Sequence, residues 1–307
     1  MDDQVARFRA DLERLTGGPP ARLGLAVSGG PDSLALLLLA EAAYPGRIEA
    51  ATVDHGLRPE SGAEADFVAR LCAARGIPHR ILPARMTETA NLQAAARARR
   101  YALLNAWLGE IGAPFLATAH HLDDQAETLV LRLLRGAGLA GLSAIRAASP
   151  PIVRPLLGWR REELAGLVAA AGIVPADDPS NRDARFDRAR VRRRLAENPW
   201  LAPEPLARSA GALAEADAAM EWMAERLRRE RVVESADGVT LDPSGLPAEL
   251  QRRLVRAILA AMGGPAPRGE AVTRLLASLR AGRTATLAGV KCRGGSLWRF
   301  APAPPRR

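Results

Sequence analysis

The ten residues Leu25–Leu34 constrain this chain more than any other stretch. A short apolar run stops at a Ser-Gly-Gly triplet, and an acid and a hydroxyl follow before a long Leu/Ala run begins. This order predicts a strand, a tight turn and a helix. The glycines let a ligand approach the backbone closely, and the amides at the helix N-terminus carry partial positive charge. The turn is therefore predicted to bind an anion, and phosphate is the most common choice.

Two common nucleotide-binding loops do not fit this turn. A Walker loop needs a lysine, but the only lysine of the chain is Lys291 and no Gly-Lys-Ser or Gly-Lys-Thr occurs. The Gly-x-Gly-x-x-Gly spacing of a dinucleotide fold is also missing. The alternative is a glycine-rich turn with no chemical role. All six residues of Ser28–Ser33, placed between an apolar strand and an apolar helix, favour the anion site.

Strand-like and helix-like patterns alternate over the first half of the chain. The predicted strands are 23–27, 48–53, 79–82 and 114–118, and the helices between them are 33–43, 63–75 and 92–111. This alternation predicts an α/β fold, a doubly wound and mainly parallel sheet with helices on both faces. Polar motifs begin at Ser28, Asp54 and His120, at or just after strand ends. Ligands of such sheets bind at that edge.

The chain is long enough for about two domains. We predict a nucleotide-binding domain over 1–200, a helical linker over 201–230 and a small α+β module over 231–307. In the module, short strands are expected at 239–241, 284–287 and 296–300, and helices at 250–262 and 271–279.

The charge balance points to a polyanionic partner. Forty-three basic and 34 acidic residues leave a net charge of +9. The alternative is a codon bias that has loaded the surface with arginine. Aromatic residues make up 4% of the chain, which argues against a row of base-stacking platforms.

Several classes of protein are disfavoured by the sequence. No apolar run reaches the length of a membrane span, and the first residues lack the pattern of a signal peptide. Cys72 and Cys292 lie in no Cys-x-x-Cys, so neither a disulfide framework nor a zinc or redox motif is indicated. We expect a cytoplasmic protein without membrane contact.

The segment His120–Thr128 is the densest polar cluster. It follows a buried-type strand and carries two histidines together with Asp123, Asp124 and Glu127. Acids in a first helical turn stabilise the helix, which is the plain explanation. The cluster exceeds that need, and carboxylate oxygens suit Mg²⁺. Zinc is the rival, but no third histidine or cysteine stands nearby at ligand spacing.

Two arginine groups could clamp phosphate. Arg97 and Arg100 are three apart on a predicted helix and share a face. The segment 186–194 alternates arginine with small residues and follows an acidic loop at 177–183. A solvated basic surface is the alternative for both groups.

These motifs, in this order, resemble the tRNA(Ile)-lysidine synthetase family, a branch of the PP-loop ATP pyrophosphatases. The likeness covers most of 20–195, and the matching segments are 28–33, 54–58, 96–101, 120–128, 132–136, 154–157, 178–181 and 188–192. The His-His-x-Asp-Asp-Gln block is the most specific of them. One departure is Ala189, where the family usually has asparagine.

The resemblance implies a reaction and a set of site residues. ATP would adenylate O2 of a wobble cytidine in an isoleucine tRNA with a CAU anticodon, and free L-lysine would then displace AMP. The implied cofactors are ATP and Mg²⁺. Implied catalytic residues are Asp32, Asp123, Asp124, Arg97 and Arg190; ATP-binding residues are Ser28, Gly29, Gly30, Pro31, Asp32, Ser33, Val53 and His55; substrate-binding residues are His120, Glu127, Arg100, Arg188 and Arg192; metal ligands are Asp32 and Asp124.

Three other functions compete with this interpretation. A PP-loop tRNA thiolase would need cysteines that carry sulfur, and an amidating synthetase would use a small molecule in place of a polyanion. The third is a nucleic-acid-binding module on a dead nucleotide fold, which the intact motifs disfavour. The oligomeric state is left open, with a homodimer as one option.

Overall fold

The computed structural model describes residues 2–54, 56, 60–84, 92–176, 187–263, 267 and 269–303. The chain divides into two compact units, Met1–Ala214 and Glu215–Arg307. A long helix, α9 (Pro203–Arg231), contains the division. The three-part division predicted from the sequence stays a prediction.

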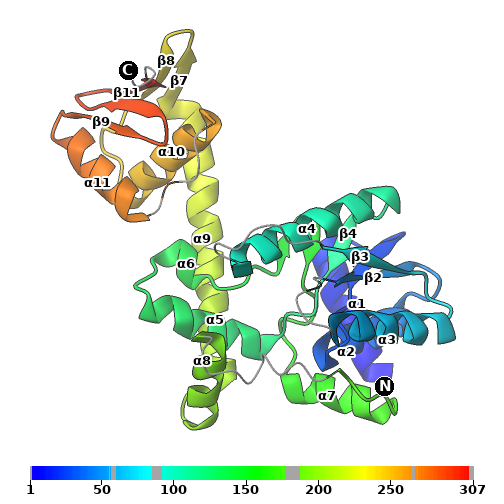
Figure 1. The fold of residues 1–307 in the computed structure, drawn as a ribbon. Helices are drawn as coiled ribbons and strands as arrows, with labels where there is room; N and C mark the ends of the chain where they lie inside the picture. The colour runs from blue at the N-terminus through cyan, green and yellow to red at the C-terminus, as the bar shows by residue number, and fades with distance from the viewer. Residues whose placement is uncertain are drawn as a thin grey trace. The chain divides into compact units, whose positions relative to one another are not determined.

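The first unit is built on a six-stranded sheet of order β3-β2-β1-β4-β6-β5 (Figure 1). Its strands are β1 (Leu23–Ala26), β2 (Ile48–Asp54), β3 (His79–Pro83), β4 (Phe115–Ala117), β5 (Ala148–Ser149) and β6 (Ile152–Val153). The first five in this order are parallel, and β5 runs antiparallel to β6 at the edge. The mainly parallel sheet is confirmed, while the short strands β5 and β6 were not predicted.

Helices cover both faces of this sheet. They are α1 (Asp2–Thr16), α2 (Pro31–Ala43), α3 (Glu60–Ala74), α4 (Leu92–Glu110) and α7 (Arg161–Ala170). The unit also contains α5 (Leu122–Leu134), α6 (Leu139–Leu142) and α8 (Asp187–Ala196). One apolar core joins α1, α2, α3 and α7 to the sheet, and a second core joins α4. A Cβ at Gly24 of β1 would lie 2.7 Å from Leu108 of α4, so glycine permits this close packing. The doubly wound arrangement is confirmed.

The second unit is a five-stranded antiparallel sheet with helices on one face. The strand order is β7-β8-β11-β10-β9. The strands are β7 (Val232–Ser235), β8 (Gly238–Leu241), β9 (Thr284–Leu287), β10 (Val290–Arg293) and β11 (Trp298–Pro302), and the helices are α10 (Ala248–Ala261) and α11 (Gly269–Arg280). One face of the sheet and both helices share an apolar core. The small α+β module is confirmed; β7 and β10 were missed.

A buried arginine fastens α10 to α9 in the second unit. Arg253 is 6% exposed, and its guanidinium lies 2.6 Å from both Asp217 and Glu221 and 3.1 Å from Glu249. Burial alone would lower the pKa of Arg253, but these carboxylates raise it. A buried cation surrounded by acids is tolerated because its charge is matched. Among the described helices, none is both long and apolar enough to cross a membrane.

Candidate active site

The loop between β1 and α2 has the geometry that the sequence predicts for an anion cradle. Gly29 has φ +83°, a conformation that residues with a side chain rarely adopt. Its carbonyl accepts a hydrogen bond of 3.0 Å from the amide of Ala176, which anchors the loop from outside. Gly30 is extended at the N-cap, and Pro31 opens α2. The first amides of α2 are therefore directed to the carboxyl edge of the sheet.

Two serines hold the loop in shape. The Ser33 hydroxyl accepts a hydrogen bond of 3.1 Å from the Ser28 amide and donates one of 2.9 Å to the Gly30 carbonyl. The two hydroxyl oxygens lie 3.2 Å apart. Ser33 is 6% exposed, so its hydroxyl serves the loop itself. The predicted ATP contacts of Ser28 and Ser33 stay predictions.

Three carboxylates lie around a fully buried histidine beside this loop. His121 Nε2 lies 3.4 Å from Asp32 Oδ2 and 3.6 Å from Asp124 Oδ2, and Nδ1 lies 3.6 Å from Asp123 Oδ2. Burial alone would lower the pKa of His121, but the three acids outweigh it and raise the pKa to about 9. The imidazolium thus acts as an internal cation. Sequence reasoning chose His120 and missed His121, because nothing local says which of two adjacent histidines faces inward.

Asp123 links α5 to the start of α7. Its Oδ2 accepts a hydrogen bond of 2.9 Å from the Arg161 amide and lies 3.4 Å from Arg160 Nε. Burial raises its pKa, but His121 and the Arg161 amide outweigh burial and hold the pKa well below its usual range. These contacts position the start of α5. The catalytic role predicted for Asp123 stays a prediction.

Asp124 and Asp32 remain the acids nearest the anion loop. Asp124 Oδ2 accepts a hydrogen bond of 3.2 Å from the His121 amide. Among the described residues, none donates a hydrogen bond to Asp32 Oδ1, although that oxygen is buried. A buried oxygen with spare lone pairs fits a cation ligand. No cluster of three or more acidic, histidine or cysteine side chains suited to a metal occurs in the described part of the chain.

Glu127 is buried one turn further along α5 and is surrounded by arginines. Its carboxylate lies 2.7 Å from Arg192 Nε, 3.4 Å from Arg188 Nε and 3.5 Å from Arg161 Nη2. Burial lowers the pKa of Arg192, but the Glu127 carboxylate outweighs it and raises the pKa. Arg188 also donates a hydrogen bond of 3.0 Å to Thr128 Oγ1. The structure thus brings Glu127, Arg188 and Arg192 together, with Arg188 within 4.0 Å of Asp124.

Arg190 lies apart from this cluster. It is exposed and forms an ion pair with Asp187 in the first turn of α8. Residues two apart on a helix do not share a face, which explains why Arg188 and Arg192 contact Glu127 while Arg190 does not. The catalytic role predicted for Arg190 stays a prediction.

A second basic group surrounds Tyr101. The guanidinium carbons of Arg97 and Arg100 lie 5.1 and 5.2 Å from the centre of its ring. Burial alone would raise the pKa of Tyr101, but Arg100 and Arg97 outweigh it and lower the pKa. Arg154, which follows β6 and is 7% exposed, acts in the same direction. The sequence analysis included Tyr101 and Arg154 in the matching segments 96–101 and 154–157 but gave neither residue a role.

His120 follows β4 and is influenced electrostatically by arginines of both basic groups. Burial lowers its pKa to about 3, and the charges of Arg154 and Arg100 act in the same direction while Asp124 opposes them. Its Nδ1 lies 3.0 Å from Thr118 Oγ1. A neutral imidazole can hydrogen-bond to a substrate without adding charge.

The remaining predicted site residues lie at the same edge or outside the described residues. Val53 is half-buried near the carboxyl end of β2, which pairs with β1. His55 and the predicted acidic loop at 177–183 lie outside the described residues.

Comparisons with known proteins agree with this geometry. Residues 4–198 match the family described as PP-loop domain, and residues 244–301 match the TilS substrate binding domain. The chain is 50% identical over 317 aligned positions to a tRNA(Ile)-lysidine synthase of Novosphingobium aromaticivorans, covering 100% of this chain and 96% of the relative. It is 44% identical to a tRNA(Ile)-lysidine synthase of Zymomonas mobilis, covering 99% of this chain and 95% of the relative.

One solved structure supports the fold. The U34-tRNA thiolase NcsA of Methanococcus maripaludis aligns with a TM-score of 0.58 at 20% identity, covering 70% of this chain and 79% of that chain. At that identity the likeness concerns the fold alone. The two whole-chain matches and the PP-loop domain decide the family. The chain belongs to the tRNA(Ile)-lysidine synthase family of ligases, built on an ATP-using PP-loop domain.

Proposed function

We propose that this chain joins free L-lysine to C2 of the wobble cytidine, position 34, in an isoleucine tRNA with a CAU anticodon. Cytidine O2 attacks the α-phosphate of ATP, and pyrophosphate leaves. The ε-amine of lysine then attacks C2, and the C2–O2 bond breaks as AMP leaves with that oxygen. The amine loses its protons during the second step. The products are lysidine, AMP and pyrophosphate. The names of the relatives support the substrates.

The proposal rests on one observation: the carboxylates of Asp32 and Asp124 both lie close to the imidazole of His121. It places the acid of the anion loop beside the acids of α5, at the edge of the sheet where strands β1 and β4 both end. Loop amides that hold a departing diphosphate need acids beside them to hold its cation. Asp32 and Asp124 would hold Mg²⁺, which offsets phosphate charge when bound.

The basic groups supply the other half of the site. Arg97, Arg100 and Arg154 surround Tyr101, where they would offset charge that develops on the α-phosphate. Glu127 holds Arg188 and Arg192 through its buried carboxylate, so in this structure it acts as a positioning residue for them. Direct contact of Glu127 with substrate stays a prediction. Asp124 is the alternative acid for the lysine ammonium.

The buried cysteines argue against the thiolase alternative. Cys72 and Cys292 are both fully buried, and burial raises the pKa of each thiol to about 11. A protonated buried thiol is a poor sulfur carrier. One lies in α3 and the other in β10 of the second unit.

Mass spectrometry of one purified tRNA tests the proposal. The full chain is incubated with ATP, isotopically labelled lysine and a tRNA(Ile) transcript with a CAU anticodon. We expect one nucleoside to gain the mass of a labelled lysine minus one water, with one AMP and one pyrophosphate released per adduct. A matched transcript with uridine at position 34 should gain nothing. Pyrophosphate release without tRNA, or transfer of sulfide in place of lysine, would contradict the proposal.

A further inference from the structure

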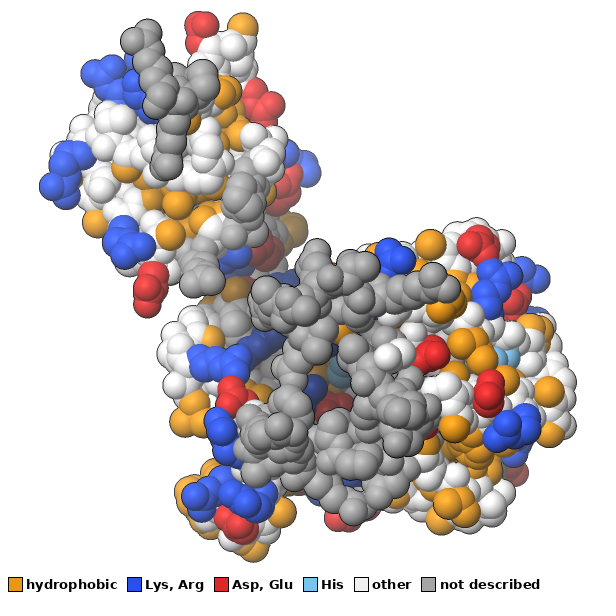
Figure 2. Space-filling view, in the orientation of Figure 1, with side chains coloured by type: hydrophobic (Ala, Val, Ile, Leu, Met, Phe, Trp, Pro, Cys, Tyr) orange, Lys and Arg blue, Asp and Glu red, His pale blue; other side chains and the backbone are white. Residues whose placement is uncertain are grey.

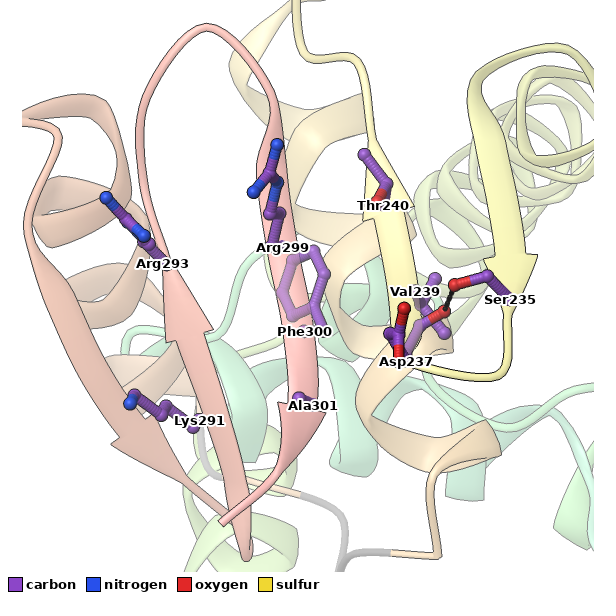
Figure 3. Close-up of a pocket in the computed structure, with 10 residues that line it drawn as sticks. Ser235, Asp237, Val239, Thr240, Lys291, Arg293, Arg299, Phe300 and Ala301 are labelled. Atoms are coloured by element: carbon purple, nitrogen blue, oxygen red, sulfur yellow. Dashed lines mark hydrogen bonds between the residues drawn. The ribbon is translucent and has the colours of Figure 1, made fainter.

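Arg7 of α1 has a specific set of partners in the first unit. Basic side chains occur on the surfaces of both units (Figure 2), and others line a hollow of about 460 Å³ over β8, β10 and β11 of the second unit (Figure 3). The guanidinium of Arg7 instead donates hydrogen bonds of 2.9 Å to Glu163 and 2.7 Å to the Gly158 carbonyl. Its central carbon lies 4.1 Å from the centre of the Trp159 ring. Arg7 therefore joins α1 to the turn that precedes α7.

The indole of Trp159 is held by two residues of α1. The side chain is fully buried, and its Nε1 donates a hydrogen bond of 3.1 Å to Asp11 Oδ2 while Arg7 lies over the ring. Arg7 and Asp11 are four residues apart, so they share one face of the helix. A cation over the face of an indole and an acceptor at its edge fix both the plane and the rotation of the ring. The orientation of Trp159 is thus determined by α1.

The backbone of Trp159 fixes the start of α5. The amide of Leu122, the first residue of α5, donates a hydrogen bond of 2.9 Å to the Trp159 carbonyl. Because the first amides of a helix have no acceptor within the helix, this carbonyl helps to set where α5 begins. In return, the amide of Arg161, the first residue of α7, donates to Asp123 Oδ2. The two helices therefore cap each other, and His121 stands one residue before Leu122.

We propose that α1 positions the carboxyl edge of the sheet for catalysis: Arg7 and Asp11 fix Trp159, and Trp159 in turn fixes the start of α5. Trp159 is therefore a positioning residue, and the reaction that it serves rests on the function proposed above. The start of α5 carries His121 and Asp124, so its placement sets the spacing of the acids beside the anion loop. A displacement of about 1 Å at reacting groups costs about 100-fold in rate. A small shift of this turn would therefore slow the chemical step without loosening substrate binding.

The same helix offers a matched control at Tyr44. The guanidinium carbon of Arg9 lies 5.9 Å from the centre of the Tyr44 ring, and Arg9 donates a hydrogen bond of 3.0 Å to the Ala43 carbonyl. The Tyr44 hydroxyl donates a hydrogen bond of 3.0 Å to Glu13. An arginine and an acid four residues apart thus hold one aromatic ring, as they do at Trp159. Tyr44 directly follows α2, at the opposite end of that helix from the anion loop.

Steady-state kinetics of two full-length double variants test the proposal. The test variant Arg7→Gln/Asp11→Ala and the control variant Arg9→Gln/Glu13→Ala both leave the net charge unchanged, and each releases one aromatic ring. Pyrophosphate release is measured with ATP, lysine and the tRNA transcript. We expect the test variant to lower kcat about 10-fold and to keep the KM values for ATP and tRNA within about twofold of wild type. The control variant should keep the wild-type kcat, even where both variants lower the thermal midpoint equally. Equal kcat values for the two variants would overturn the proposal.

Hydrogen exchange tests the chain of contacts without any substrate. Mass spectrometry of peptides that contain the Leu122 amide reports on the hydrogen bond to the Trp159 carbonyl. We expect this amide to exchange at least about 5-fold faster in the test variant and at the wild-type rate in the control variant. Phe8 and Leu12 are fully buried in the apolar core and hold α1 in place in both variants. Unchanged exchange of Leu122 in the test variant would overturn the proposal.

The two measurements separate this inference from the proposed function. If the wild-type chain forms no lysine adduct but Leu122 exchanges faster in the test variant alone, the proposed reaction fails and the positioning of α5 by α1 stands. If the adduct forms and the test variant matches wild type in both kcat and exchange, the positioning role fails and the reaction stands.

Discussion

His121 Nε2 lies 3.4 Å from Asp32 Oδ2, so a fully buried imidazole joins the anion loop to the start of α5. The same ring lies 3.6 Å from Asp124 and 3.6 Å from Asp123. Because three carboxylates face one imidazolium, the spacing of the acids depends on its charge.

Replacing His121 with alanine should destabilise the first unit by about 3 kcal/mol, because the buried acids lose their shared cation. Urea unfolding followed by tryptophan fluorescence measures the loss. Millimolar Mg²⁺ should restore part of the stability of this variant, since a divalent cation can take the place of the imidazolium between Asp32 and Asp124. If Mg²⁺ does not change the thermal midpoint of the His121→Ala variant, Asp32 and Asp124 are not ligands of this ion.

Asp32→Ala should lower the rate of adenylation by about 100-fold or more while tRNA binding is largely kept, because it removes an acid that holds the nucleotide's cation. Pyrophosphate release and anisotropy measure the two effects. Glu41→Gln is the matched control, because Glu41 lies on the same helix and, among the described residues, its carboxylate pairs with Arg75, 2.6 Å away. Turnover that survives Asp32→Ala would show that the metal role is wrong.

Glu127→Gln should cost about 3 kcal/mol of stability, because it leaves three arginines beside a neutral buried amide. Arg192→Gln alone should cost less, since Arg188 and Arg161 still match the carboxylate. A double-mutant cycle on Glu127 and Arg192 should give a coupling energy of about 1–3 kcal/mol. Additive losses would mean that the pair does not interact.

Arg190→Gln should leave the free energy of unfolding within about 0.5 kcal/mol of wild type, because its only described ion pair is exposed. If Arg190 contacts phosphate as predicted, the variant should bind ATP or tRNA more weakly, with a smaller salt slope. KM values for ATP and tRNA and a salt slope identical to those of wild type would show that Arg190 does not contact phosphate.

The cysteines should be inert at physiological pH. Because burial raises the pKa of both thiols to about 11, the reactive thiolate forms only as pH approaches that value. Iodoacetamide at pH 8 should therefore label the folded protein far more slowly than the protein unfolded in urea. Cys72→Ala/Cys292→Ala should turn over lysine within about twofold of wild type, since no sulfur passes through either residue. Loss of product in a folded double variant would revive the thiolase alternative.

The sequence by itself determined the parallel sheet, the helices on both faces and the position of the anion loop. These features follow from local patterns: apolar runs of strand length, a Gly-Gly turn and polar residues at strand ends. The same local patterns placed Asp32, Asp124 and His120 at one edge of the sheet.

Only the tertiary structure decided which charges match one another. The choice of His121 over His120 as the buried cation depends on Asp32, which is far away in the sequence. Glu127 pairs with Arg192, which lies 65 residues further along the chain in α8. Pairings of this kind arise from packing between separate elements, and the sequence near each residue carries no record of them. The strands β7 and β10 were also missed; each is held in the sheet by the strands with which it pairs.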